Sequence, residues 1–271
     1  MKKLGLKRVY VFFSTFFVFM LHLPIAFAKG KHISKEFPLT SSAKSSIVIK
    51  DFKAAKADSI ASVVSGIYDS LKLGSLGLTQ TVFDYAYQGF SYLKEIGKIS
   101  NDHIISIVDF SKSSAQKRLF IIDLKSMKVL FNTYVAHGQN SGEEYARQFS
   151  NSIESDESSL GFYETADTYM GKNGYSLRLE GLEKGFNDNA YEREIVMHGA
   201  SYVNEQLIRK RGYIGRSWGC PAVPQRLHKY IINKIKNGTC LFIYSPDRNY
   251  ITHSDIIKQA AYAPVMAYNY Q

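Results

Sequence analysis

Two short stretches of the 271-residue chain carry residue types suited to nucleophilic chemistry. Cys220 lies among small and polar residues in the segment 215–223, GRSWGCPAV, and His198 follows the apolar run 195–197. A thiol nucleophile needs a base or a cation that favours the thiolate, and backbone N–H groups that hold an oxyanion. We therefore predict that Cys220 is a nucleophile and that His198 is the base that receives its proton.

The neighbours of these two residues favour an open, polar site. Gly199 lets the chain turn sharply after His198, and Gly219 allows a close backbone approach, so that a substrate carbonyl can reach the N–H groups beside the thiol. Pro221 removes one N–H and fixes the chain directly after Cys220. Arg216 is a candidate either to favour the thiolate or to grip a substrate carboxylate.

Structural roles for the same residues stay open from the sequence alone. A pair of cysteines in an oxidising compartment can form a disulfide, here between Cys220 and Cys240. Cys240 precedes an apolar run, as a buried strand residue does, whereas the polar surroundings of Cys220 favour the nucleophile. His198 has the alternative of a satisfied core histidine. A zinc site from His137, His198 and Cys220 matches no compact ligand spacing, so no metal is expected.

Strand-like runs lie where they can position both residues. They are residues 104–109, 118–124, 128–136, 161–165, 175–179, 194–197 and 238–244. The runs 118–124 and 128–136 flank a short polar turn, which predicts a β-hairpin that leads into His137 and Gly138. The runs 161–165 and 175–179 are candidate walls of a site within an otherwise irregular stretch, 139–190, and long loops of this kind are often functional.

Helical spacing occurs before the first strand and again before the last. Apolar residues recur every three or four positions over 60–71, and a second helix is expected from Thr79, as its cap, to Gly97. Another helix is expected over 225–236. The sequence therefore predicts a mainly β protein with α-helices, of the α+β class, with a small helical element over residues 51–100.

The N-terminus has the three parts of a secretory signal peptide. A basic start with Lys2, Lys3, Lys7 and Arg8 precedes a long apolar run that ends in Ala26-Phe27-Ala28. We predict a signal peptide over residues 1–28, followed by a flexible leader over 29–50, and export to the periplasm or cell envelope. An uncleaved membrane anchor is the alternative, since the apolar run is long enough.

The net charge of the chain argues against a nucleic-acid partner and excludes few other functions. Loss of residues 1–28 would remove four basic and no acidic residues, which lowers the net charge from +10 to +6. The remaining basic residues form no concentrated block, so a nucleic-acid partner is not expected. A mildly basic surface suits a polyanionic envelope, and an ordinary solvated surface explains it equally well.

The motif around the two central residues resembles that of the YkuD-type L,D-transpeptidases. In that family a His-Gly pair precedes a Ser/Thr-x-Gly-Cys segment by about twenty residues, as His198-Gly199 precedes Ser217-Trp218-Gly219-Cys220 here. The closer resemblance is to the murein L,D-transpeptidase catalytic domain, over roughly residues 60–245. It rests on the segments VAHG at 135–138, FSN at 149–151, SLG at 159–161, GLE at 181–183 and RSWGCPA at 216–222.

The resemblance implies a fold and a set of roles. It implies a YkuD-like β-sandwich catalytic domain over residues 101–248, on which the helical element packs, with a C-terminal tail over 249–271. Cys220 would be the acylated nucleophile and His198 the base, while Ser217 and Gly219 would shape the pocket and the oxyanion site. Apart from the resemblance, the residues themselves offer candidate substrate contacts: His137, Gly199, Arg216, Trp218 and Tyr202, with Asn204 and Tyr213 as weaker candidates. For Tyr202, Asn204, Tyr213 and Trp218, packing within the protein is the alternative, and the more common one. His137 either lines the cleft or is a hydrogen-bonded wall residue.

The implied reaction is acyl transfer on peptidoglycan stem peptides, with no cofactor and with a monomeric enzyme. The thiolate attacks the carbonyl between an L-centre and a D-residue, the terminal D-residue leaves, and a thioester forms on Cys220. An amine from a neighbouring stem then gives a cross-link, whereas water gives L,D-carboxypeptidase activity. A non-catalytic peptidoglycan-binding protein of the same fold is a further alternative, because fold alone does not imply activity.

Two positions depart from the usual family motif. The residue before the Gly-Cys pair is commonly His, and here it is Trp218; an Arg or Asn commonly follows soon after the Cys, and here Pro221 follows directly. The roles of that second His and of that Arg are therefore not carried over. Arg216 is the candidate substitute on the other side of the thiol.

Overall fold

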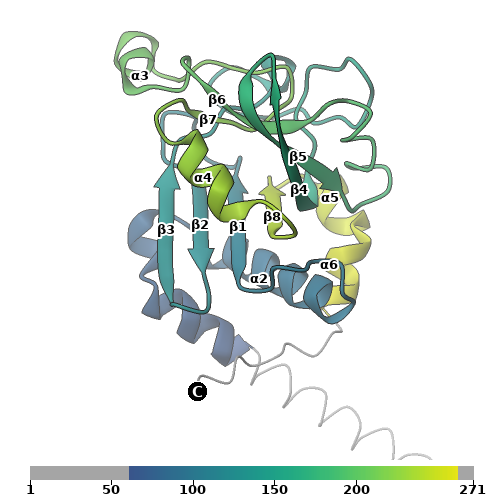
Figure 1. The fold of residues 1–271 in the computed structure, drawn as a ribbon. Helices are drawn as coiled ribbons and strands as arrows, with labels where there is room; N and C mark the ends of the chain where they lie inside the picture. The colour runs from purple at the N-terminus through teal and green to yellow at the C-terminus, as the bar shows by residue number, and fades with distance from the viewer. Residues whose placement is uncertain (1–60, 262–271) are drawn as a thin grey trace, which may run out of the picture. The chain divides into compact units, whose positions relative to one another are not determined.

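The computed structural model describes residues 61–261 of the chain (Figure 1). The predicted signal peptide and leader, and residues 262–271 of the predicted tail, lie outside the described residues. Eight strands form one mixed sheet in the order β3-β2-β1-β8-β4-β5-β6-β7. The predicted fold class, mainly β with α-helices, is confirmed.

The strands agree with most of the apolar runs in the sequence. β1 and β8 are parallel, as are β6 and β7, and the other neighbours are antiparallel. The predicted hairpin is present as β2 and β3. The strands are β1 (Ile104–Asp109), β2 (Leu119–Asp123), β3 (Lys128–Thr133), β4 (Gly161–Gly171), β5 (Gly174–Gly181), β6 (Val196–Ala200), β7 (Ala222–Pro224) and β8 (Cys240–Tyr244).

The helices agree less completely with the helical segments predicted from the sequence. Besides the helical residues 61–70, they are η1 (Leu73–Leu76), α2 (Gln80–Glu95), η2 (Gln139–Ser141), α3 (Glu205–Arg211), α4 (His228–Ile235), α5 (Arg248–His253) and α6 (Asp255–Ala260). Thr79 caps α2 as predicted, because its side chain accepts a hydrogen bond from the Val82 N–H at 3.4 Å. α3 was not expected, since it buries none of its residues and so has no apolar spacing to detect.

The main core lies where α2 packs on the central strands. A Cβ atom at Gly89 of α2 would lie 2.0 Å from Cζ of Phe162 in β4, so glycine is what lets the helix approach the sheet. Phe162 in turn stacks on Phe242 of β8, with ring centroids 4.2 Å apart. Every residue of β1 and β8 is buried, which explains why these strands are continuous apolar runs rather than alternating ones.

The sheet curls until its two edges meet, so that it is nearly barrel-shaped. The chain that leaves β3 at one edge pairs with β7 at the other edge through an isolated bridge between Ala136 and Ala222. A second bridge joins Gly138 to Ser217. This closure brings the His137-Gly138 segment beside the loop that carries Cys220.

The stretch 139–190, expected to be mostly irregular, contains a long hairpin. β4 and β5 span 11 and 8 residues and meet at Gly171 and Gly174. The prediction was wrong in extent because the outer half of β4 has no buried residue, and the pairing shifts between Thr165 and Thr168, so the apolar pattern stops before the strand does. Within residues 61–261 no helix is both long enough and apolar enough to cross a membrane.

Candidate active site

Cys220 and His198 lie on adjacent elements at the β6–β7 end of the sheet. His198 of β6 is in register with Ala222 of β7, and Cys220 precedes Ala222 by two residues. The thiol therefore stands at the entrance to β7, beside the strand that carries the imidazole. Both Cys220 and Cys240 are free thiols, and Cys240 is fully buried at the start of β8, so no disulfide joins them.

The Cys220 sulfur is held by the backbone that leads into β6. The Val196 N–H donates to Sγ at 3.4 Å, and the thiol faces the Glu194 carbonyl oxygen at 3.6 Å. Burial raises the pKa of the Cys220 thiol; the Val196 N–H and the charge of Arg193 oppose this rise, and Glu194 adds to it. The resting side chain is therefore a neutral thiol that must lose its proton when it attacks.

His198 is arranged as a neutral base. Its Nδ1 lies 3.0 Å from the carbonyl oxygen of Gly199. Because a carbonyl can only accept, Nδ1 carries the hydrogen and Nε2 is left unprotonated. Burial lowers the pKa of His198; the bond to Gly199 opposes this change and the neighbouring His228 adds to it. An unprotonated imidazole is the form that can receive a thiol proton near neutral pH.

His228 is a neighbour of His198 that was not predicted from the sequence. A Cβ atom on Gly199 would lie 2.6 Å from Cγ of His228, so the Gly199 backbone rests directly against this ring. The His228 Nδ1 lies 2.6 Å from the Gln225 carbonyl oxygen. The glycine after His198 therefore serves close packing as well as the turn.

The nucleophile loop, residues 217–220, is fixed by two serines. The Ser217 hydroxyl donates to the Cys220 carbonyl oxygen at 2.6 Å and accepts from the Gly219 N–H at 3.2 Å. The Ser158 hydroxyl donates to the Gly219 carbonyl oxygen at 3.3 Å. In the described part of the chain, these bonds leave the backbone N–H groups of Trp218 and Cys220 without a protein acceptor.

Gly219 meets two requirements at once. Its φ of +109° lies in the region that residues with a side chain rarely adopt. A Cβ atom would also lie 2.8 Å from the Glu157 carbonyl oxygen. The backbone that lies against Gly219 in the structure is that of Glu157, and the approach of a substrate carbonyl stays a prediction.

His137 is placed inside the protein wall. Its side chain is completely buried, its Nδ1 accepts from Nη2 of Arg118 at 2.7 Å, and its Nε2 lies 3.2 Å from the Gly142 carbonyl oxygen. Burial, and then the charge of Arg118, lower the pKa of His137 to about 3. With both ring nitrogens engaged and no exposed atom, His137 corresponds to the wall alternative. Its carbonyl accepts from the Ser217 N–H at 2.9 Å, which ties it to the nucleophile loop.

The structure separates the other candidate contacts into two groups. Tyr202 lies near the thiol: burial, and then Cys220, raise the pKa of its phenol to about 12. Trp218 is 77% exposed directly beside the loop glycine. Arg216 instead donates to the carbonyl oxygens of Gln139 and Gly142, at 3.2 and 3.1 Å, so its guanidinium is engaged away from the sulfur.

The two weaker candidates have structural partners. The Asn204 side chain caps α3 by accepting from the Leu207 N–H at 2.9 Å. The Arg211 guanidinium lies over the Tyr213 ring, 4.7 Å from its centroid. Asn204 nevertheless lines the pocket described next.

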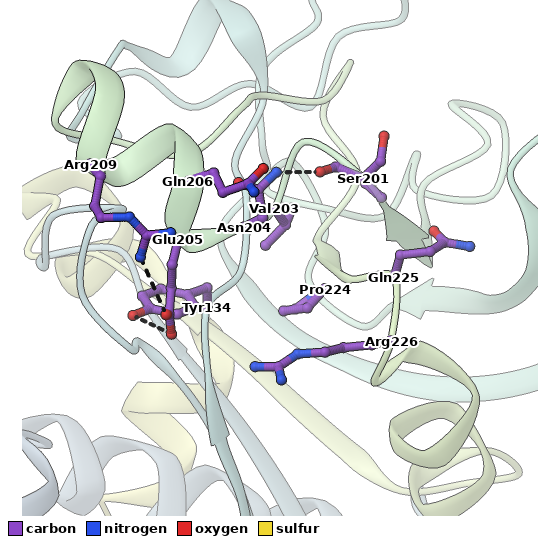
Figure 2. Close-up of a pocket in the computed structure, with 11 residues that line it drawn as sticks. Tyr134, Ser201, Val203, Asn204, Glu205, Gln206, Arg209, Pro224, Gln225 and Arg226 are labelled. Carbon is purple, nitrogen blue, oxygen red and sulfur yellow. Dashed lines mark hydrogen bonds and ion pairs between the residues drawn. The ribbon is translucent and has the colours of Figure 1, made fainter.

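A pocket of about 480 Å³ opens at the carboxyl ends of β6 and β7 (Figure 2). Ala200 and Pro224 line it from the strands, two residues beyond His198 and Ala222 respectively. Charged groups line its other sides: Glu205, Arg209 and Arg226. Because Cys220 precedes Ala222, the pocket and the thiol lie on opposite sides of His198 along these strands.

The comparison with known sequences identifies one family. The sequence model of the L,D-transpeptidase catalytic domain matches residues 75–244, more than half of the chain. A search of curated protein sequences gave no match.

Solved structures align with this chain at low similarity. The helical cell shape determining protein Pgp2 from Campylobacter jejuni aligns at 15% identity and a TM-score of 0.36, over 65% of this chain and 60% of that one. An L,D-transpeptidase from Mycobacterium smegmatis aligns at 10% identity and a TM-score of 0.33, over 53% of this chain and 59% of that one. The chain therefore spans about three fifths of the length of these structures.

Proposed function

Because this chain belongs to the L,D-transpeptidase catalytic domain family, we propose that it transfers acyl groups between peptidoglycan stem peptides through a thioester on Cys220. One observation carries the proposal. His198 is a neutral imidazole, oriented by the Gly199 carbonyl, in the strand that adjoins the free thiol. A base in this state beside a cysteine is the arrangement that thiol acyl transfer requires.

The first half of the proposed reaction forms the thioester. The Cys220 proton moves to Nε2 of His198 as the sulfur attacks the carbonyl of the bond between the L-centre and the D-residue. The backbone N–H groups of Trp218 and Cys220, which have no acceptor in the described part of the chain, are the candidate donors to the resulting oxyanion. His198 then returns the proton to the departing amine of the D-residue, and the C–N bond breaks.

The second half consumes the thioester. An amine of a second stem peptide gives one proton to Nε2 of His198 and attacks the same carbonyl. The C–S bond breaks, and His198 returns this proton to the departing sulfur, which restores the thiol. The amine must come within reach of His198, so it approaches from the side where the 480 Å³ pocket lies. Arg209 and Arg226 in this pocket suit the carboxylates of a stem peptide, and this supports transpeptidation over hydrolysis.

The proposed place of action follows from the substrate and from the predicted signal peptide. Peptidoglycan lies outside the inner membrane, and residues 1–28 have the pattern that directs export. We therefore propose the periplasm or cell envelope as the site of the reaction, with a monomer as the active unit.

The test is a product analysis by mass spectrometry. Purified protein, Cys220→Ala and Cys240→Ala are each incubated with tetrapeptide muropeptides. The wild type and Cys240→Ala should release the terminal D-residue and form cross-linked dimers, while Cys220→Ala should lose at least ~10³-fold in rate, the scale on which removal of a nucleophile acts. Identical products from the wild type and Cys220→Ala would refute the catalytic role.

The same experiment separates the two alternatives. Tripeptide without any dimer would identify a carboxypeptidase that uses water as the acceptor. Absence of any product from the wild type, together with retained binding to peptidoglycan sacculi, would identify a non-catalytic binding protein of this family.

A further inference from the structure

Arg193 is the most heavily bonded cation near the thiol, and the motif around Cys220 does not include it. It lies in the turn before β6, and its guanidinium makes four hydrogen bonds. Nη1 donates to the Ser150 carbonyl at 2.7 Å and to the Ser159 hydroxyl at 2.9 Å. Nη2 donates to the Ser155 hydroxyl at 3.1 Å and to the Glu157 carbonyl at 2.6 Å. The charge is therefore fixed in one position.

That position adjoins the nucleophile. A Cβ atom on Gly219, the residue before Cys220, would lie 3.4 Å from Nη2 of Arg193. The same turn supplies the Glu194 carbonyl, and the first residue of β6 supplies the Val196 N–H; these two backbone groups hold the sulfur. One short segment thus sets both the place of the thiol and the place of the charge.

The charge of Arg193 is not cancelled by a direct partner. All four hydrogen bonds go to neutral oxygens, and none of the ion pairs within 4.0 Å in residues 61–261 includes Arg193. Asp156, Glu157 and the buried phenol of Tyr163 act on it electrostatically.

Other groups do not replace this charge at the sulfur. Cys220 precedes a strand rather than opening a helix, so no helix dipole favours its thiolate. Glu194 and Tyr202, the other titratable groups that interact with the thiol, carry negative charge when they ionise. Burial keeps His198 neutral before proton transfer.

We propose that Arg193 is a positioning residue that holds a fixed positive charge beside Cys220 and so stabilises the thiolate that forms as the proton passes to His198. Arg193 itself stays protonated throughout, and no proton or electron is gained or lost beyond the Cys220-to-His198 transfer. This inference rests on the proposed role of Cys220 as nucleophile.

The test measures the rate of alkylation by iodoacetamide as a function of pH. The modified Cys220 and Cys240 peptides are quantified by mass spectrometry in the purified wild type, Arg193→Met, Arg193→Lys and Arg216→Met. Arg193→Met should move the pH midpoint for Cys220 upward by about one unit or more, the effect of losing a nearby opposite charge. Arg193→Lys should give a smaller rise, because lysine keeps a charge but cannot make four fork-like bonds. Arg216→Met removes a nearby guanidinium that points elsewhere and should leave the midpoint unchanged.

Three results would overturn the inference: an unchanged midpoint in Arg193→Met, an equal rise in Arg216→Met, or equal rises in Arg193→Lys and Arg193→Met. If Arg193→Met does not fold, the comparison of Arg193→Lys with Arg216→Met decides, and coincident curves reject the inference. Circular dichroism of each variant establishes that it is folded. Because alkylation uses no peptidoglycan, this test can fail while the proposed function stands, and the reverse.

Discussion

The central strands and the β6–β7 end of one sheet are built on different principles. β1 and β8 are paired along their whole length and buried in every residue. β7 has only three residues, two isolated bridges lie beside it, and the positive φ angles of Glu194 and Gly219 flank the thiol. The regular region stabilises the molecule, while the irregular end leaves the backbone N–H groups of Trp218 and Cys220 without an acceptor among residues 61–261.

The two regions also differ in what covers them. Most buried apolar residues belong to one large cluster around α2 and the central strands. Ala136, Ala200, Val203, Ile214 and Ala222 form a small second cluster, to which the chain that joins β6 to β7 contributes Val203 and Ile214. A mutation of equal size should therefore cost far more stability in the centre than at the reactive end.

The largest expected difference compares two aromatic residues. Phe242→Ala removes a fully buried ring that stacks on Phe162, and should lower the free energy of unfolding by about 3–5 kcal/mol. Trp218→Ala removes a ring that is 77% exposed, and should change it by less than about 0.5 kcal/mol. Urea unfolding measures both, and similar losses would contradict the contrast between the regions.

A smaller effect is expected from one added methyl group on a helix. Gly89→Ala places a Cβ against the Phe162 ring and should cost about 1–3 kcal/mol through overpacking. Gly66→Ala is the matched control, because it lies in the helical residues 61–70 with no atom within 4 Å of the added carbon. It should be neutral or slightly stabilising, as alanine is a better helix former than glycine. Equal melting temperatures for the two variants would show that α2 does not pack tightly at Gly89.

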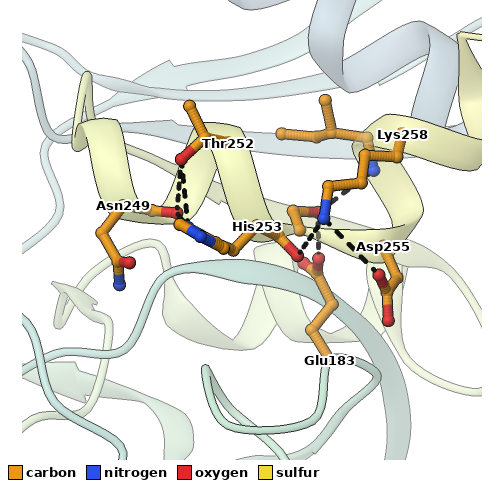
Figure 3. Close-up of polar contacts among 8 residues, drawn as sticks. Glu183, Asn249, Thr252, His253, Asp255 and Lys258 are labelled. Carbon is orange, nitrogen blue, oxygen red and sulfur yellow. Dashed lines mark hydrogen bonds and ion pairs between the residues drawn. The ribbon is translucent and has the colours of Figure 1, made fainter.

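The smallest effect concerns a buried carboxylate on the regular side. Glu183 accepts from the Phe162 N–H and from the Tyr250 hydroxyl, each at 2.8 Å, and from the Ser254 hydroxyl at the junction of α5 and α6. Figure 3 shows Glu183 reaching this helix pair near Asp255 and Lys258. Burial raises the pKa of Glu183; its hydrogen bonds oppose the rise and Asp255 adds to it.

The raised pKa of Glu183 determines the direction in which the free energy of unfolding changes with pH. The folded state binds the Glu183 proton more tightly than the unfolded state does. The resulting contribution to the free energy of unfolding is therefore complete below the pKa of Glu183 in the unfolded state, and it is lost as the pH rises through its pKa in the folded state. Unfolding free energies of the wild type and Glu183→Gln are compared across this range. The wild type should lose stability relative to the variant by at most about 1.4 kcal/mol per pH unit. Glu192→Gln removes an exposed carboxyl and serves as the control, and a curve for Glu183→Gln that follows the wild type would show that Glu183 does not titrate in this way.

The elements that could be predicted from the sequence are those whose buried residues produce a recognisable pattern of apolar positions along the chain. β1 is the predicted run of 104–109, because a strand buried on both faces is continuously apolar. α3 buries nothing, and α5 and α6 are each only six residues long, so their periodicity is weak. Only their capping residues, Asp247 and Ser254, give a local signal.

The residues of the candidate site also fall into two groups, those that could be predicted from the sequence and those that could not. Cys220 and His198 stand in compact motifs, which is why sequence reasoning selected them. Arg193 bonds to residues 34 to 43 positions away, and Ser158 reaches Gly219 across 61 positions. No local spacing encodes such contacts, and only the closed sheet brings them together. The nearest signal in the sequence was the SLG segment that directly follows Ser158.

The bridge between Ala136 and Ala222 has a consequence for the timing of folding. It joins segments far apart in the chain, and contacts of this kind form late because the entropy of loop closure must be overcome first. The hydrogen bond from Ser158 to Gly219 also joins distant segments, so the loop that carries Cys220 reaches its final geometry only in the folded sheet. Under the proposed mechanism, the Val196 N–H and Arg193 reach Cys220 only in the folded sheet, so the folding time of the sheet sets the moment at which acyl transfer can begin.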